Sequence, residues 1–363
     1  MTSVADRARR TITWQEASAS RVALERALEA ARAADPTVGR LLASGEQVIY
    51  TGAGTSYHLA RTVAWVHRTT LRRPALAAPL SELLLRQDGV LNGGDPERQP
   101  IVVISRSGAT SEGVAVAERF GAARHPIVAV TCRPDSPITG IAPHSLVSPA
   151  GDETAIVMTR SFTSMLALVL RVIANLAADT TLMRDLDGLP ARWEQSEAAT
   201  EGAFALAEQA WSRIVILGGG PANGVAHEVA LKITEMSQAP TSTYEPLEFR
   251  HGPISVCEPG VLVITLVIPP GARAELRVTG EVRALGSAAW VLGGDLPAGR
   301  WQDDSGNGMG PLHRTDLGAA LHPAARLLTL MPPLQAFAVG VAVARGCDPD
   351  RPRHLSQVVR LSE

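Results

Sequence analysis

The first residues suited to chemistry follow a short apolar run. Residues 101–110 read Ile-Val-Val-Ile-Ser-Arg-Ser-Gly-Ala-Thr, so four β-forming residues pass directly into hydroxyls, an arginine and a glycine. This pattern is typical of a buried parallel strand with a ligand loop at its carboxyl end. Ser105, Ser107 and Thr110 can donate hydrogen bonds to an anion. Gly108 lets backbone N–H groups turn inward, and the helix expected next offers its positive end, so the loop has the chemistry of a phosphate cradle.

A second loop of the same kind precedes it in the chain. The short run Gln47–Tyr50 is followed by Thr51-Gly-Ala-Gly-Thr-Ser-Tyr-His58, which offers the hydroxyls of Thr55 and Ser56 before a helix. Two hydroxyl-rich loops at the ends of two parallel strands can converge on one phosphate, whereas either loop alone is weak evidence. Arg106 would add a permanent cation to such a site.

Charged residues later in the chain have the types needed for proton transfer. Glu228, Lys232 and Glu235 are spaced four and three residues apart and would line one face of a helix. Such a stripe is most often a solvated surface, so the spacing alone does not define a site. The segment Glu248–Pro253 follows soon after and holds His251 before a glycine and a proline. The charged residues of Glu248–Pro253 favour a catalytic role for Glu228, Lys232 and Glu235.

The composition limits the class of protein. The 363 residues exceed one typical domain, and 45% of them are hydrophobic, which supports well-packed cores. A net charge of −2 and an aromatic content of 4% argue against a nucleic-acid partner. Cys132, Cys257 and Cys347 are too widely spaced for a disulfide framework or a zinc site, and the histidines show no ligand spacing, so no metal is expected. The turn Gly218–Gly224 lacks the dinucleotide-binding spacing, so no cofactor is expected.

The first residues are not followed by an apolar signal region, and the sequence has no uninterrupted apolar run of about eighteen residues. We therefore expect a cytoplasmic protein with no membrane span.

The elements that would position these residues alternate between strand and helix. Helix is expected over Thr11–Leu42, where Ala, Leu, Arg and Glu dominate. The expected strands are Gln47–Thr51, Ala75–Ala78, Ile101–Ser105, Pro126–Thr131, Ser145–Ser148, Ser212–Leu217, Val261–Val267, Ala288–Leu292 and Leu327–Met331. Further helices are expected at Ser111–Phe120, Ser161–Ala178 and Val225–Met236. This alternation predicts an α/β fold with mainly parallel sheets flanked by helices.

Two cycles of strand, glycine-rich turn and helix indicate a duplicated α/β domain. We expect an N-terminal helical segment at 1–42, a first subdomain with a long connecting helix at 43–200, and a second subdomain with the C-terminal tail at 201–363. The polar stretch 179–202 is expected to be the linker region. Leu296–Thr315, rich in Gly, Asp and Pro, is expected to be a surface loop.

Taken together, these motifs resemble those of sugar isomerase (SIS) domain proteins, especially the isomerase half of glucosamine-6-phosphate synthase and related amino-sugar-phosphate isomerases and deaminases. The resemblance lies in six segments that occur in the same order over nearly the whole chain: Gly54–His58, Ser105–Thr110, Ala150–Glu153, Ala230–Glu235, Glu248–Pro253 and Pro352–Leu355. It implies two SIS subdomains, an amino-sugar 6-phosphate as substrate, and a homodimer.

The resemblance also implies a role for each matched residue. Glu235 would move a proton between C1 and C2 of the sugar. His251 would help to open the sugar ring, reaching the site from the second subunit. The phosphate-binding residues would be Thr55, Ser56, Ser105, Arg106, Ser107 and Thr110. The supporting residues would be Glu153, Lys232, Glu248 and Gln357.

Three departures from the synthase pattern leave the reaction open. The sequence begins without the cysteine of a glutaminase domain, so it is not expected to draw ammonia from glutamine. Gln357 stands where the synthase pattern has a lysine, and glutamine cannot form a Schiff base or transfer a proton. Met158 replaces a serine near C1 and C2 of the substrate, and Arg106 replaces the usual glutamine, as in the deaminase-like relatives.

Three functions are compatible with these residues. The leading expectation is aldose–ketose isomerisation with deamination of glucosamine or galactosamine 6-phosphate. The first alternative is a lyase or dehydratase that eliminates the C3 substituent of an N-acetylhexosamine 6-phosphate, because an acetylated nitrogen leaves poorly. The second is a non-catalytic sugar-phosphate sensor, which would need neither Glu235 nor His251.

Overall fold

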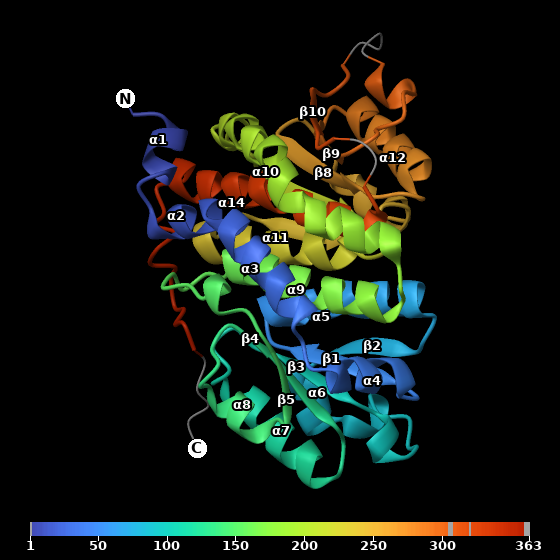
Figure 1. Ribbon diagram of the computed structural model, residues 1–363. Coiled ribbons are helices and arrows are strands. Elements are labelled where there is room, and N and C mark those ends of the chain that lie inside the picture. The colour runs from blue at the N-terminus through green and yellow to red at the C-terminus, as the bar shows by residue number, and fades with distance from the viewer. Residues whose placement is uncertain (1, 304–307, 319–320, 359–363) are drawn as a thin grey trace. The chain divides into compact units, whose positions relative to one another are not determined.

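The computed structural model describes residues 2–303, 308–318 and 321–358, and it divides into two compact units (Figure 1). The first unit comprises Ser18–Pro190 with Ser356–Glu363, and the second comprises Met1–Ala17 with Ala191–Leu355. The helical segment predicted at 1–42 is therefore divided between the two. Asp350 helps to hold the early residues to the second unit, because its carboxylate accepts hydrogen bonds of 2.8 Å from the N–H groups of Ile12 and Thr13.

The first unit is built on a five-stranded parallel sheet in the order β2-β1-β3-β4-β5. Its strands are β1 (Val48–Gly52), β2 (Ala75–Pro79), β3 (Ile101–Ile104), β4 (Ile127–Thr131) and β5 (His144–Val147). Every residue of β1, β3 and β4 is buried, which explains why these strands are apolar throughout instead of alternating. The strand order changes direction between β1 and β3, and open α/β sheets bind ligands at such a switch point.

Helices cover this sheet, and short 3₁₀ turns join them. The helices are α3 (Ser20–Arg32), α4 (Pro36–Ser44), α5 (Thr55–Leu71), α6 (Leu80–Leu85), α7 (Ser111–Ala122), α8 (Pro137–Ile141) and α9 (Arg160–Leu176). The 3₁₀ turns are η1 (Gln87–Gly89), η2 (Pro96–Arg98) and η3 (Pro149–Gly151). Helix α9 is buried along most of its length, and it packs against α3 and α5.

The second unit repeats this topology. Its strands are β6 (Arg213–Gly218), β7 (Thr241–Tyr244), β8 (Val261–Val267), β9 (Ala288–Gly293) and β10 (Leu312–Asp316), parallel and in the order β10-β9-β8-β6-β7. In chain order this is again second, first, third, fourth, fifth. The other elements of this unit are α1 (Val4–Ala8), α2 (Ile12–Ser18), α11 (Ala222–Ser237), α12 (Ala272–Ala284), α13 (Pro323–Thr329), α14 (Met331–Ala344), η4 (Glu248–Arg250), η5 (Pro253–Val256) and η6 (Arg300–Gln302). Helix α10 (Thr180–Ala207) crosses the boundary between the units.

Both units turn from the first strand into the first helix in the same way. A Cβ on Gly52 would lie 2.6 Å from the backbone carbon of Ser56, and a Cβ on Gly218 would lie 2.6 Å from the carbonyl oxygen of Ala222. Only glycine permits this close approach of strand and helix four residues apart. The shared turn supports a duplicated fold and shows that Gly218–Gly224 is a packing turn.

The α/β architecture with two parallel sheets is confirmed, and eight predicted strands lie within one residue of the observed ends. Two other predictions are wrong. Leu327–Met331 is helical, because a short apolar run reads the same in a buried helix as in a buried strand. The strand β10 (Leu312–Asp316) overlaps the end of the predicted loop Leu296–Thr315. It was missed because it is a polar edge strand. The predicted linker 179–202 contains the division between the two units, after Pro190, and it is helical because it lies almost wholly within α10.

The short strand β7 was not predicted at all, since its residues Thr-Ser-Thr-Tyr carry no apolar alternation. Among the described residues, one segment, Pro323–Ala344, is long and apolar enough to cross a membrane by length and composition, with a mean hydropathy of 1.8. However, 94% of its apolar window is buried inside the protein, and the core helix of a folded domain meets the same criterion.

Candidate active site

The loop between β3 and α7 folds into a compact hydroxyl cluster. Ser105 Oγ lies 3.3 Å from Thr110 Oγ1 and accepts a 3.1 Å hydrogen bond from the N–H of Gly108. Ser107 Oγ accepts a 3.2 Å bond from the N–H of Ala109. Because the Ser107 hydroxyl accepts from the backbone, its own proton stays available for donation. The loop is thus held by its own hydroxyls in a shape that presents further donors.

Gly108 is required for this shape. Its φ is +58°, and a Cβ there would lie 2.1 Å from Ser136 Oγ and 2.8 Å from the Cγ2 of Ile138. The Gly108 carbonyl also accepts a 3.0 Å bond from the N–H of Ile138 at the start of α8. The loop is therefore fixed from outside as well as from within.

Helix α7 begins directly after this loop. Thr110 is its N-cap residue, and among the described residues the Thr110 side chain makes no cap hydrogen bond. Helix N-termini carry partial positive charge and unpaired N–H groups, which bind anions. The start of α7 is consequently available to an anion, and the Thr110 hydroxyl, 3.3 Å from Ser105 Oγ, lies beside it.

The other predicted loop follows the neighbouring strand β1. Thr55 and Ser56 open α5 and are each 4% exposed, and Gly54 before them has a φ of +53°. Since β1 and β3 are adjacent and parallel, both hydroxyl loops leave the same edge of the first sheet at its switch point. The fold therefore places the two predicted phosphate loops at one edge, as expected.

Arg106 holds three backbone carbonyl groups in addition to supplying positive charge. Its side chain is buried and donates hydrogen bonds to the carbonyl oxygens of Ala155 (2.9 Å), Ile156 (3.1 Å) and Gln357 (3.3 Å). The guanidinium keeps its positive charge, but its donors hold the segment after Glu153 and the C-terminal tail. Arg106 is therefore a positioning residue for this edge of the first unit as well as a source of positive potential.

Glu153 organises the same region. It is 2% exposed, and its carboxylate accepts bonds from the N–H groups of Thr159 (2.8 Å) and Ser161 (2.9 Å) and from the Thr159 hydroxyl (2.5 Å). These donors lie at the start of α9, where a negative charge is favourable. Its own carbonyl oxygen accepts a 2.8 Å bond from Gln357 Nε2. Glu153 and Gln357, which were both predicted as supporting residues, are thus joined by a hydrogen bond within the first unit.

In the second unit, α11 carries the predicted proton-transfer residues. Lys232 Nζ lies 2.5 Å from Glu235 Oε2 and 3.7 Å from Glu228 Oε1. The side chains of Lys232 and Glu228 are 4% and 1% exposed, so these residues do not form a solvated stripe. The Glu235 side chain is 20% exposed, and among the described residues its Oε1 has no hydrogen-bond partner. Glu235 therefore presents one free oxygen while Lys232 holds the other.

The turn with His251 is anchored by its neighbours. Phe249 is fully buried in the core of the second unit, and its ring centroid lies 5.4 Å from that of Tyr244. Glu248 and His251 are exposed on either side of it. Glu245, which the sequence analysis did not single out, accepts bonds from the N–H groups of Leu247 (2.9 Å) and Glu248 (3.3 Å) and so fixes the start of η4. The turn presents its histidine outward.

Glu275 was also missed by the sequence analysis. It lies at the strand ends of the second sheet, and a Cβ on Gly219 or Gly271 would lie 2.5 Å from its Oε1. Burial, with a contribution from the nearby Glu245 carboxylate, raises the pKa of Glu275 to about 7. Where the first unit has hydroxyl loops, the second has this buried acid and Ala222 in place of Ser56. The two switch points are therefore chemically different.

The predicted site residues thus fall into two sets. The hydroxyl loops, Arg106, Glu153 and Gln357 belong to the first unit, and the last three are joined by hydrogen bonds. The α11 residues and the His251 turn belong to the second unit.

The chain belongs to the SIS domain family. The family model matches residues 41–174 and 209–292, which is one match in each unit and together more than half of the chain. Both hydroxyl loops lie in the first match, and the α11 residues and the His251 turn lie in the second.

Two of the curated relatives are aminotransferases by name. The chain is 28% identical over 321 residues to the glutamine–fructose-6-phosphate aminotransferase (isomerizing) of Methanothermobacter thermautotrophicus, covering 87% of this chain and 52% of that protein. It is 30% identical over 334 residues to the enzyme of the same name from Pyrobaculum aerophilum, covering 90% and 53%. The chain thus spans about half the length of these relatives.

Solved structures match nearly the whole chain. Glucosamine-6-phosphate deaminase from Thermotoga maritima superposes with a TM-score of 0.75 at 26% identity, covering 97% of this chain and all of that one. Tagatose-6-phosphate ketose/aldose isomerase from Escherichia coli has a TM-score of 0.80 at 23% identity, covering 94% and 96%, and shows the shared fold.

Gly108→Ala should destabilise the protein by about 2–4 kcal/mol, because alanine disfavours a positive φ and its Cβ would overlap Ser136. It should also weaken binding of phosphate esters. Urea unfolding and equilibrium binding measure the two effects. Gly140→Ala, where a Cβ meets no atom within 4 Å, is the matched control and should behave as the wild type. A Gly108→Ala protein with unchanged stability and affinity would contradict the proposed loop constraint.

Glu275→Gln should change how stability depends on pH. The folded protein keeps the Glu275 proton up to about pH 7, whereas the unfolded chain releases it near its ordinary pKa of 4.5, so this group lowers stability as pH rises between these values. The variant should match the wild type below pH 4.5 and exceed it by about 3 kcal/mol above pH 7.

Tryptophan fluorescence during urea unfolding is a suitable readout, since five of the six tryptophans lie in the second unit. The exposed Glu258→Gln is the control and should show no pH-dependent difference from the wild type. A constant offset between Glu275→Gln and the wild type at all pH values would show that Glu275 does not titrate abnormally.

Proposed function

We propose that the protein is an enzyme that acts on an amino-sugar 6-phosphate, in which Glu235 transfers a proton between C1 and C2. The expected outcome is aldose–ketose isomerisation with deamination of glucosamine or galactosamine 6-phosphate. The observation that carries this proposal is the geometry of Glu235: a carboxylate with one oxygen held 2.5 Å from buried Lys232 and the other oxygen unoccupied by the described residues.

This geometry suits a general base. The ammonium group of Lys232 holds one oxygen of Glu235 in a fixed direction and leaves the other free to take a proton. Partial burial strengthens the electrostatic contact and limits competition from water. A carboxylate held in one orientation can abstract a proton next to a carbonyl when the substrate is positioned close to it.

The hydroxyl loops of the first unit support a phosphate-bearing substrate. Ser107 and Thr110 place hydroxyl groups at the uncapped start of α7, and Thr55 and Ser56 follow the adjacent strand. Phosphate bound there supplies binding energy remote from the reacting carbons and orients them. The deaminase from Thermotoga maritima, named for glucosamine 6-phosphate, supports an amino sugar as the substrate class.

The proposal includes a homodimer in which His251 serves the site of the other subunit and helps to open the sugar ring. In support, His251 is exposed within its own chain, on a turn fixed by buried Phe249 and by the Glu245 cap. An imidazole is suited to moving a proton at neutral pH, because its ordinary pKa is near 6.5. No cofactor enters this scheme, and a cytoplasmic location stays a prediction.

Gln357 favours a second candidate, elimination of the C3 substituent from an N-acetylhexosamine 6-phosphate. Its Nε2 donates to the carbonyl oxygen of Glu153 at 2.8 Å, so the residue acts as a tether and not as an acid or base. Elimination needs removal of the C2 proton by Glu235 but no lysine at this position. The third possibility, a sugar-phosphate sensor, would not require the Glu235 arrangement.

Proton NMR in D₂O separates these functions. With glucosamine 6-phosphate, the isomerase/deaminase should exchange the C2 proton and form a ketose phosphate, and Glu235→Gln should lower the rate by at least about a thousandfold. An unsaturated product from N-acetylglucosamine 6-phosphate would establish elimination instead. Glu258→Gln is the control and should keep wild-type activity. Near-normal turnover by Glu235→Gln would exclude Glu235 as the base.

Heterodimers test the placement of His251. Glu235→Gln and His251→Ala subunits carrying different tags are co-expressed, and the mixed dimer is purified. If histidine acts across the interface, one site of the mixed dimer has both residues, so it should show about half of wild-type activity while each parent dimer is inactive. The mixed dimer of wild type with the double variant is the control, since it has no complete site. If the mixed dimer of Glu235→Gln and His251→Ala subunits is inactive, His251 acts in the site of its own subunit.

A further inference from the structure

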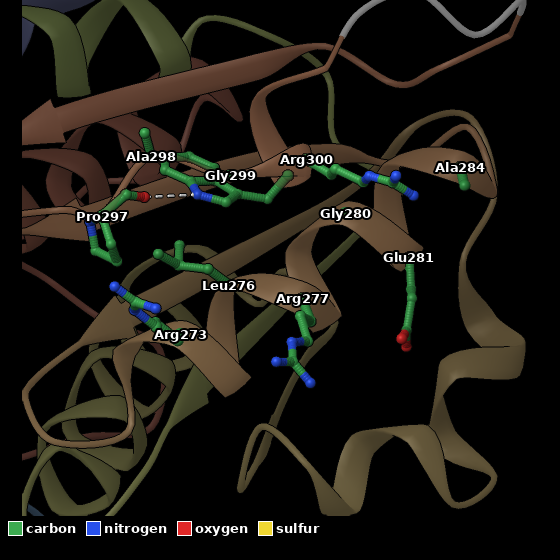
Figure 2. A pocket seen from close by; sticks show the side chains of 11 residues that line it. Arg273, Leu276, Arg277, Gly280, Glu281, Ala284, Pro297, Ala298, Gly299 and Arg300 are labelled. Carbon is green, nitrogen blue, oxygen red and sulfur yellow. Dashed lines mark hydrogen bonds between the residues drawn. The ribbon is translucent and has the colours of Figure 1, made fainter.

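The second unit contains a cavity that none of the proposed catalytic residues lines. It lies between α12 and the segment 297–301, and its volume is about 700 Å³ (Figure 2). This volume falls within the range of pockets that hold small organic molecules. We call it the arginine pocket, after the three arginines that line it, Arg273, Arg277 and Arg300.

These arginines reach the pocket from two elements. Figure 2 shows Arg273 and Arg277 on α12 and Arg300 on the opposite segment. Among the described residues, none of the three guanidinium groups has a hydrogen-bond or ion-pair partner. Arg273 and Arg277 are four residues apart on a helix, where two like charges repel each other. An arrangement of unpaired like charges around a cavity is favourable once an anion binds between them.

The only carboxylate that lines the pocket within the described part of the chain does not neutralise these arginines. Glu281 is paired at 2.7 Å with Arg250, which lies outside the pocket. The pocket is therefore strongly positive, although the whole chain has a net charge of −2. This local excess of cations contrasts with the balanced charge of the rest of the molecule.

The walls are fixed in place. Trp301 Nε1 donates a 2.9 Å bond to the carbonyl oxygen of Pro297, drawn as the dashed line in Figure 2. Arg283, which is 1% exposed, donates a 2.7 Å bond to the carbonyl oxygen of Trp301 and so ties this segment to α12. Leu276 and Trp301, which are 1% and 4% exposed, give the pocket an apolar base. The pocket is thus formed before any ligand binds.

We propose that the arginine pocket is a binding site for a small organic polyanion, either a phosphate ester or a polycarboxylate. Guanidinium groups form paired hydrogen bonds with both phosphate and carboxylate oxygens, and charges from two sides suit a ligand with at least two negative groups. The apolar base accommodates the carbon part of the ligand. This site does not depend on the proposed reaction, because it shares no residue with it.

Calorimetric titration with inorganic pyrophosphate tests the proposal. The starting protein is the full chain with Ser107→Ala and Thr110→Val, so that the hydroxyl loop does not contribute. We expect one site per chain with a dissociation constant of about 1 mM or lower at moderate salt. Replacing Arg273, Arg277 and Arg300 with glutamine should weaken pyrophosphate binding at least about tenfold. A parallel titration with citrate distinguishes a carboxylate from a phosphate ligand.

Two controls separate a built site from general attraction of anions. Arg10, Arg72 and Arg73 are exposed arginines elsewhere, and replacing them with glutamine removes the same charge but should change the affinity less than about twofold. Ala298→Trp fills the pocket and keeps all three arginines, so it should abolish binding. Equal weakening by both triple variants, unchanged binding in Ala298→Trp, or no saturable binding of either anion would overturn the proposal.

Discussion

The buried carboxylate of Glu153 is the interaction on which the candidate phosphate region depends. An ionised group that is 2% exposed is tolerated only when its oxygens are satisfied, and Thr159 and Ser161 provide three separate donors at the start of α9. Each hydrogen bond to a charged group contributes roughly 1.5–3 kcal/mol. The contact fixes the segment that follows Glu153, and that segment supplies the carbonyl oxygens to which Arg106 binds. The loop at the end of β3 is therefore held partly by an acid that lies more than forty residues later in the chain.

The two units show how one topology can serve two kinds of chemistry. Both have the strand order with a switch point between the first and third strands, and both use a glycine to bring the first helix close to the first strand. In the first unit the strand ends carry hydroxyls and an uncapped helix, which suit an anion. In the second unit the corresponding edge holds the buried carboxyl of Glu275, which repels an anion whenever it is ionised. Helix α11, which follows the first strand of the second unit, instead carries the Glu235 carboxylate and the Lys232 ammonium group on adjacent turns.

Local sequence predicted most of this architecture because buried parallel strands are continuous apolar runs, as in Ile101–Ile104 and Val261–Val267. The prediction failed at Leu327–Met331, because this apolar run belongs to buried helices and not to a buried strand. It also failed at β10, because a polar edge strand lacks the apolar pattern of a buried one. Candidate site residues were predicted from their types and family resemblance, but the partners of Arg106 and Glu153 were not. Glu275 carries no local signal, because its raised pKa arises from burial in the folded protein and from the Glu245 carboxylate, which lies in another element.

The hydrogen bonds of Gln357 have a consequence for how the chain end is used. The tail crosses back from the second unit's residues to the first unit, where Arg106 and the Glu153 carbonyl hold it. Arg106 and Glu153 therefore complete their hydrogen bonds only with a residue that lies more than 200 positions later in the chain. A domain boundary drawn after α9 would separate the phosphate loop from part of its own support.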